Sequence, residues 1–164
     1  MLALAVALAP HLEVVRFNFP YREKGSARPD PMPVLIRTIR EVAQPYSPCF
    51  LGGRSMGGRA ASMLAADGFD CAGLLLFAYP LHPAGKPEKL RNAHLEAIKA
   101  PVLCFNGTRD DLCGRALMEK SVAGLANWTQ HWLEGAKHSF ADGKAMEEVA
   151  RVTAAWLRAC MDIQ

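Results

Sequence analysis

The sequence lacks three features that would place it in a specialised class: a long apolar run, a basic run and cysteines in a metal-binding pattern. A membrane span needs about 18 consecutive apolar residues, and no segment approaches that length. The 19 lysines and arginines are scattered and barely outnumber the 16 aspartates and glutamates. We therefore expect no membrane insertion and no nucleic-acid binding.

The five cysteines are odd in number and none is spaced as a zinc ligand pair. We expect free thiols, no metal site and a reducing, cytoplasmic compartment. Cys49 and Cys104 fall in predicted buried strands, where a thiol acts as a small apolar group. The apolar segment 1–9 lacks a positive flank and is too short for a full signal peptide.

The length and composition are those of an ordinary globular domain. The chain has 164 residues, of which 51% are hydrophobic and 21% are charged. It shows no repeat and no low-complexity tract. We expect one domain over residues 1–164, with a single core.

Predicted strands and helices alternate along the chain. β-rich or continuous apolar runs predict strands at 12–19, 49–51, 72–79, 102–106 and 129–133. Helical periodicity predicts helices at 1–9, 34–44, 56–66, 94–99, 114–125 and 142–161. Five strands with helices between them predict an α/β fold with a largely parallel sheet. In such sheets the chemistry lies past the carboxyl ends of the strands.

A G-x-S-x-G motif covers residues 53–57, between a predicted strand and a predicted helix. Chance produces roughly 0.04 such matches in a chain of this composition. In a nucleophile elbow the serine, here Ser55, projects its hydroxyl above the sheet. The flanking Gly53 and Gly57 are expected because side chains there would strike the neighbouring strand or helix. The backbone N–H of Met56 is then a candidate donor to an oxyanion.

Other interpretations of this glycine-rich turn are a packing role or phosphate binding. A Walker loop is excluded because Arg59 and Ala60 replace the required Lys and Ser/Thr. A dinucleotide fingerprint fails because Ser55 occupies the place of its second glycine. No H-E-x-x-H motif and no calcium loop is present, so we expect no cofactor and no metal.

A serine nucleophile needs a base, and the base needs an orienting acid. Asp110 and Asp111 follow the predicted strand 102–106, and Asp110 is favoured as the first past the turn. Asp111 is the alternative acid. A purely structural interpretation is that the two aspartates cap a helix or form a solvated pair in the loop. His138 lies in the loop after the last predicted strand, which completes the order Ser, Asp, His.

The four remaining histidines fit this order less well. His11 precedes a strand at the wrong end of the sheet, and His82 would break the chain order. His94 lies on a predicted helix, and His131 lies inside a predicted strand.

Several stretches resemble the dienelactone-hydrolase-like α/β hydrolases. The closest likeness is to the subset that includes the third regulatory subunit of the NSL histone acetyltransferase complex and small bacterial relatives. The stretches that carry the resemblance are VRFNFPY at 15–21, GGRSMGGR at 52–59, YPLHP at 79–83, GKPEKLR at 85–91 and GTRD at 107–110.

This resemblance implies a three-layer α/β-hydrolase sheet with helices on both faces. It implies Ser55 as nucleophile, Asp110 as acid and His138 as base. The family also has a central strand upstream, whose His-Gly-rich loop supplies one oxyanion N–H. This chain starts in the helix after that loop, so we expect an N-terminally shortened sheet with an unpaired edge beside the elbow strand. The other interpretation is a start located ~30 residues further upstream.

The sequence thus predicts a serine hydrolase that acts on a small-molecule ester-like substrate. The alternative is a non-catalytic interaction module that keeps the hydrolase fold. Four side chains are candidates for a partly cationic rim suited to an acidic acyl group: Arg54, Tyr21, His82 and Arg109. No feature indicates an oligomeric state.

Overall fold

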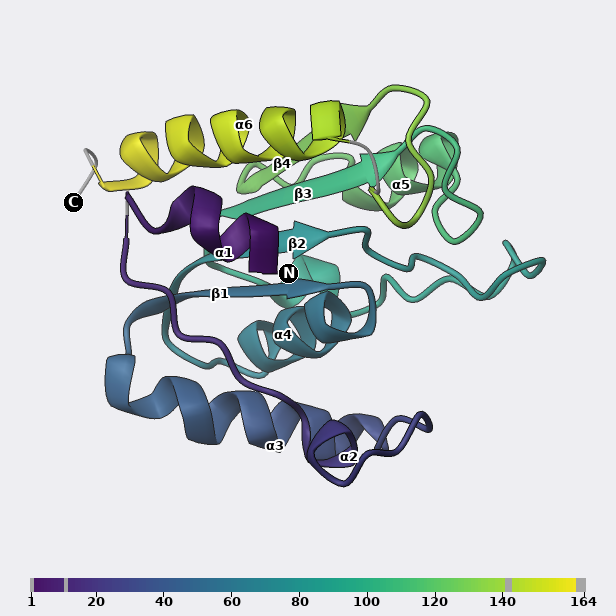
Figure 1. Cartoon of the computed structure of the whole chain (residues 1–164). Coiled ribbons are helices and arrows are strands. Elements are labelled where there is room, and N and C mark those ends of the chain that lie inside the picture. The colour runs from purple at the N-terminus through teal and green to yellow at the C-terminus, as the bar shows by residue number, and fades with distance from the viewer. Residues whose placement is uncertain (1, 11, 141–142, 162–164) are drawn as a thin grey trace.

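A parallel sheet of four strands forms the centre of the molecule, with helices on both of its faces (Figure 1). The computed structural model describes residues 2–10, 12–140 and 143–161. Within them the strand order is β1-β2-β3-β4, and every neighbouring pair is parallel. The strands are β1 (Cys49–Arg54), β2 (Cys71–Phe77), β3 (Val102–Gly107) and β4 (Trp128–Leu133).

Two layers of helices enclose the sheet. On one face lie α1 (Leu2–Leu8) and α6 (Gly143–Met161), and on the other lie α3 (Met32–Ala43), α4 (Met56–Ala66) and α5 (Arg115–Val122). The described residues also contain three short helices: α2 (Pro20–Glu23), η1 (Gln44–Tyr46) and η2 (Leu95–Ala97). The predicted three-layer α/β architecture is confirmed.

Strand β2 shows why a strand in such a sheet is apolar throughout. Leu74 and Leu76 belong to the core beneath α3 and α4, whereas Leu75 and Phe77 belong to the core beneath α1 and α6. Successive side chains of a strand point to opposite faces, so covering both faces buries β2 from Gly73 to Phe77.

The helices bury one stripe each. In α3 the buried residues are Leu35, Ile39 and Ala43, and in α6 they include Ala145 and Val149. A spacing of four residues places side chains on one face, as the sequence pattern predicts. No helix in the described ranges is both long and apolar enough to cross a bilayer.

Most predicted elements are present, with shifted ends. The helix predicted at 56–66 has those bounds, and the strand predicted at 49–51 continues through Gly52 and Gly53 to Arg54. The strand predicted at 72–79 is β2, which ends at Phe77.

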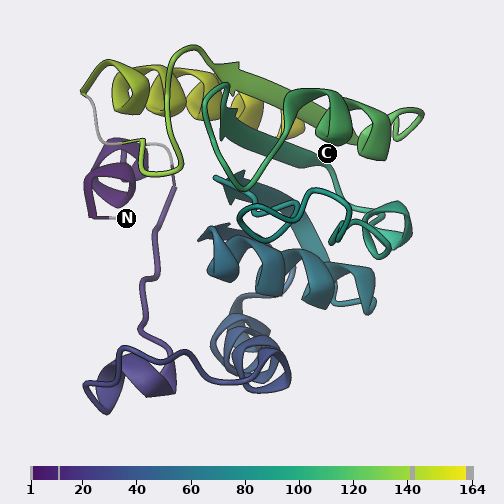
Figure 2. The same ribbon diagram turned by 90° about the vertical axis from the view of Figure 1, so that its right-hand side faces the viewer.

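The strand predicted at 12–19 is wrong: this segment forms neither strand nor helix. Residues 13–18 make no backbone hydrogen bond to another described residue, and only the segment's ends are held, at Leu12 and Phe19. Figure 2 shows it running from α1 to α2 beside the sheet. A β-rich composition becomes a strand only where another backbone lies close enough to pair.

The parallel sheet brings the turns after β1, β3 and β4 to one edge, and a close backbone contact joins two of them. Gly107 ends β3, and an added Cβ there would overlap the carbonyl group of Ala136, in the loop after β4. The N–H of Arg109 donates to that same carbonyl oxygen at 3.0 Å.

We expect Gly107→Ala to lower the free energy of unfolding by about 1–3 kcal/mol, because the backbone around Ala136 must shift. The measurement is urea unfolding followed by circular dichroism. Gly52→Ala is the matched control, since its Cβ would meet its nearest atom at an ordinary 3.5 Å. Equal stability of the two variants would contradict this account.

Candidate functional site

Ser55 occupies a strained turn between β1 and α4. Its φ is +52° and its ψ is −119°, values that side-chain-bearing residues rarely adopt. Its N–H donates to the carbonyl of Phe77 at 2.8 Å, and its carbonyl accepts from the N–H of Arg59 at 3.0 Å. These two bonds fix the turn between the strand and the helix.

Two glycines allow β1 and α4 to approach each other at this turn. A Cβ on Gly53 would lie 2.5 Å from the backbone of Gly57 and Gly58, and one on Gly58 would lie 2.7 Å from the Gly53 carbonyl oxygen. The expectation for Gly57 is wrong, because a Cβ there would meet only the Phe19 ring, at 3.7 Å. The second required glycine is therefore Gly58.

The structure brings the three predicted side chains together in one hydrogen-bonded chain. His138 Nε2 lies 2.9 Å from Ser55 Oγ, and His138 Nδ1 lies 2.9 Å from Asp110 Oδ2. A carboxylate can only accept, so Nδ1 carries the proton and donates to Asp110. The neutral ring then presents an unprotonated Nε2 to the Ser55 hydroxyl.

The two candidate aspartates differ in how far their side chains are buried. The Asp110 side chain is fully buried, and its Oδ1 also accepts from the N–H of Leu112 at 2.9 Å. Asp111 is exposed and makes no side-chain hydrogen bond or ion pair to a described residue. Only Asp110 therefore contacts the histidine.

Met56 begins α4 directly after Ser55. The first N–H groups of a helix have no acceptor within the helix, and that of Met56 bonds to no other described residue. This N–H is a free donor beside the serine hydroxyl.

A cavity of about 900 Å³ opens beside Ser55. Its walls come from α1, the 12–19 segment and β1, and Ser55, Met56 and His138 line it. Arg54 and Tyr21 also line it, whereas His82 and Arg109 do not.

The expected cationic rim is not formed. His82 is buried, donates from Nδ1 to the carbonyl of Pro83 and accepts at Nε2 from the Gly114 N–H. The charged residues that do line the cavity are of both signs: Glu13, Arg16, Glu23 and Arg54. Arg54 also donates to the backbone carbonyl of His138, at 3.1 Å.

A second serine–histidine contact, which the sequence analysis missed, lies beneath α4. Ser62 Oγ is 2.8 Å from His94 Nε2, and the Ser62 hydroxyl donates to the carbonyl of Arg59. Ser62 is fully buried, and no described carboxylate contacts the ring of His94. With its proton on a carbonyl and no route to solvent, this serine is a structural group.

All five cysteines are free thiols. Cys104 and Cys113 are buried, and the other three are half-buried. Within the described residues no group of three His, Cys, Asp or Glu side chains is placed to hold a metal ion.

Burial and the nearby Arg59 guanidinium lower the pKa of His94 to about 4. The unfolded chain binds this proton near pH 6.5, so we expect stability to fall as the pH drops from 6.5 towards 4. NMR titration of the His94 ring measures the pKa directly. Urea unfolding of His94→Gln at several pH values should show a weaker acid dependence than the wild type. A ring that titrates near 6.5 would contradict the burial argument.

Several solved structures share this fold. An α/β serine hydrolase homologue from Coxiella burnetii aligns with a TM-score of 0.72 and 22% identity, over 95% of this chain and 74% of that one. An esterase domain from Rhodothermus marinus aligns with a TM-score of 0.70 and 20% identity, over 96% and 78%. A monoacylglycerol lipase from Paleococcus ferrophilus aligns with a TM-score of 0.67 and 17% identity, over 82% and 78%. The chain is thus shorter than each of these neighbours.

Identities this low establish the fold alone. The family model for an alpha/beta hydrolase domain, however, matches residues 1–162 of the sequence itself. With the parallel sheet and the strand–turn–helix around Ser55 already described, the match settles the family: this chain belongs to the alpha/beta hydrolases.

Proposed function

We propose that the chain is a serine hydrolase that cleaves ester-type bonds, with Ser55 as nucleophile, His138 as base and Asp110 as orienting acid. The observation that carries the proposal is the unbroken hydrogen-bonded chain from Ser55 Oγ through His138 to the buried Asp110 carboxylate. Esterase and lipase neighbours of the same fold support it.

In the first half of the reaction, Ser55 Oγ attacks the ester carbonyl carbon while its proton passes to His138 Nε2. The negative charge that develops on the carbonyl oxygen is stabilised by the free N–H of Met56. Asp110 stays ionised and stabilises the imidazolium. When the tetrahedral intermediate collapses, His138 gives its proton to the leaving alcohol.

In the second half, water attacks the acyl-serine and loses a proton to His138. The second collapse returns the proton to Ser55 Oγ and releases the carboxylic acid. Atoms and protons balance without a cofactor, so the proposal needs none.

We also propose that the chain is closest to the dienelactone-hydrolase-like group. The support is the motif set of the sequence, in which GGRSMGGR at 52–59 forms the turn at Ser55 and GTRD at 107–110 carries Asp110. A small-molecule ester is the substrate class consistent with that group.

The rival function is a non-catalytic interaction module. The observation that favours it is the open cavity beside Ser55, where the N–H of Met56 is the oxyanion donor that we assign among the described residues. Removal of one oxyanion donor typically costs 10²–10³-fold in rate. Ester turnover that requires Ser55 separates the two functions.

We expect a fluorophosphonate probe to label the wild-type chain at Ser55, because His138 activates that hydroxyl. Ser55→Ala should abolish the adduct seen by intact-protein mass spectrometry. Ser62→Ala is the matched control and should leave labelling unchanged. A wild type that forms no adduct, or a Ser55→Ala variant labelled equally well, would refute the nucleophile assignment.

We expect Asp110→Asn to lower kcat/KM for p-nitrophenyl acetate by about 10³–10⁴-fold, because the amide no longer holds the imidazole tautomer or stabilises its charge. Asp111→Asn should change kcat/KM by less than about twofold, since that side chain is exposed and unpaired within the described residues. Equal losses in the two variants would show that Asp110 has no special role.

A further inference from the structure

The loop that carries Asp110 joins β3 to α5 and contains no helix or strand of its own. It spans residues 108–114. Within it, Asp110 Oδ1 accepts from the N–H of Leu112 at 2.9 Å, and the Asp110 carbonyl accepts from the N–H of Cys113 at 3.2 Å. These bonds tie the carboxylate to the loop, so the position of the loop sets the position of the carboxylate.

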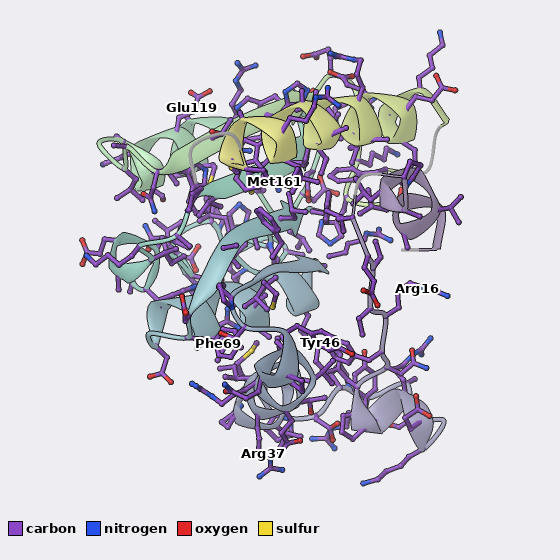
Figure 3. The ribbon with its side chains drawn as sticks, turned by 90° about the vertical axis from the view of Figure 1, so that its left-hand side faces the viewer. Arg16, Arg37, Tyr46, Phe69, Glu119 and Met161 are labelled. Carbon is purple, nitrogen blue, oxygen red and sulfur yellow. The ribbon has the colours of Figure 1, made fainter. Side chains whose placement is uncertain are left out.

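The helix that follows supports this loop from one side. Met118 is the buried residue of α5, whereas Glu119 lies at the surface of the molecule, as Figure 3 shows. Loops are more mobile than the elements that they connect. A carboxylate on a loop that leads into a surface helix therefore needs a second support if it is to keep a fixed direction.

His82 supplies a second support, and it does so at two points. Its backbone N–H donates to the carbonyl of Leu112 at 3.1 Å, and its Nε2 accepts from the N–H of Gly114 at 3.2 Å. Its Nδ1 lies 3.0 Å from the carbonyl oxygen of Pro83, which can only accept, so Nδ1 carries the proton and Nε2 is left as an acceptor. Because His82 is only 6% exposed, water has little access to these bonds.

The turn before His82 is itself fixed by the end of β3. Ala78 follows β2 at a φ of +51°, a strained value for a residue with a side chain. Its N–H donates to the carbonyl of Phe105 at 2.8 Å, and the side-chain amide of Asn106 donates to the carbonyl of Tyr79 at 3.0 Å. β3 therefore anchors both this turn and the loop that follows its own last residue.

We propose that His82 is a positioning residue for the Asp110–His138 pair. Through Leu112 and Gly114 it fixes the loop, and the loop directs the Asp110 carboxylate towards His138 Nδ1, 2.9 Å away. His82 lies outside the lining of the large cavity, so it acts through the loop. The kinetic consequence rests on the proposed ester hydrolysis, whereas the bond between His138 and Asp110 can be measured without a substrate.

Two substitutions separate the roles of the two ring nitrogens of His82. His82→Gln places an amide oxygen near the position of Nε2, so it can still accept from Gly114, whereas the shorter His82→Asn cannot reach that N–H. We expect His82→Asn to lower kcat for p-nitrophenyl acetate by about 10–100-fold, because a misplacement of about 1 Å disrupts the alignment of reacting groups. KM should change less than about twofold, and His82→Gln should keep kcat within about threefold of the wild type, because it restores the acceptor.

The hydrogen bond from His138 to Asp110 gives a readout that a merely structural role would not move. We expect a far-downfield proton NMR signal from the His138 Nδ1–H in the wild type, because the acceptor is a buried carboxylate. Asp110→Asn should remove this signal and so assign it. His82→Asn should shift it upfield or broaden it, and His82→Gln should keep it.

Tyr79→Phe is the matched structural control. It removes a buried hydroxyl that donates to the carbonyl of Arg91 at 2.7 Å, in the same segment as His82 but with a partner outside the Asp110 loop. We expect it to lower the melting temperature as His82→Asn does, while kcat changes less than about twofold and the His138 signal is retained.

Three results would overturn the proposal: a His82→Asn variant that keeps the His138 signal or, in an active enzyme, its kcat; a Tyr79→Phe variant that loses both; or a His82→Gln variant as impaired as His82→Asn. If the wild type hydrolyses no ester, the proposed function fails, and the NMR comparison still tests His82.

If His82→Asn does not fold, or the wild type gives no downfield signal, ¹⁵N relaxation of the wild-type chain decides. Order parameters at Leu112 and Gly114 as high as those of β3, about 0.85, support a fixed loop. Values clearly below those of β3 would overturn the proposal, because a mobile loop cannot direct the carboxylate.

Discussion

The close approach of β1 and α4 is the constraint on which the site depends. With no side chain at Gly53 or Gly58, the strand can turn directly into the helix, and Ser55 is forced to a positive φ at the crossing. That strain is held by the hydrogen bonds of Ser55 to Phe77 and Arg59. The hydroxyl is thereby fixed at the edge of the sheet, and the N–H groups that begin α4 remain free beside it.

A second close contact sets the other half of the site. Gly107 packs against the backbone of Ala136, which ties the loop that carries Asp110 to the loop that carries His138. The buried carboxylate of Asp110 then fixes the imidazole tautomer, since it can only accept a proton from Nδ1. The spacing of the three side chains thus follows from two backbone contacts at glycine, and the protonation pattern follows from burial of one acid.

The site lies between the four-stranded sheet on one side and the cavity beside Ser55 on the other. Towards the other side β2 and β3 are paired on both edges and packed between the two helix layers, and Asp110 and His138 follow β3 and β4. Towards the 12–19 segment the sheet ends at β1, and apolar surface from both helix layers lines the cavity. The same strand therefore positions the serine and forms the first strand of the described sheet.

The sequence by itself determined the α/β layering, the helices and the position of Ser55, because those depend on local periodicity and on a motif that spans one turn. It also placed Asp110 and His138 after the right strands, since chain order follows from the alternation of elements. Tertiary structure decided what depends on distant neighbours. Burial selected Asp110 over Asp111, and close packing required Gly58 and not Gly57. Residues 13–18 form no strand because no described backbone pairs with them. A strand, unlike a helix, takes its hydrogen bonds from elsewhere in the chain.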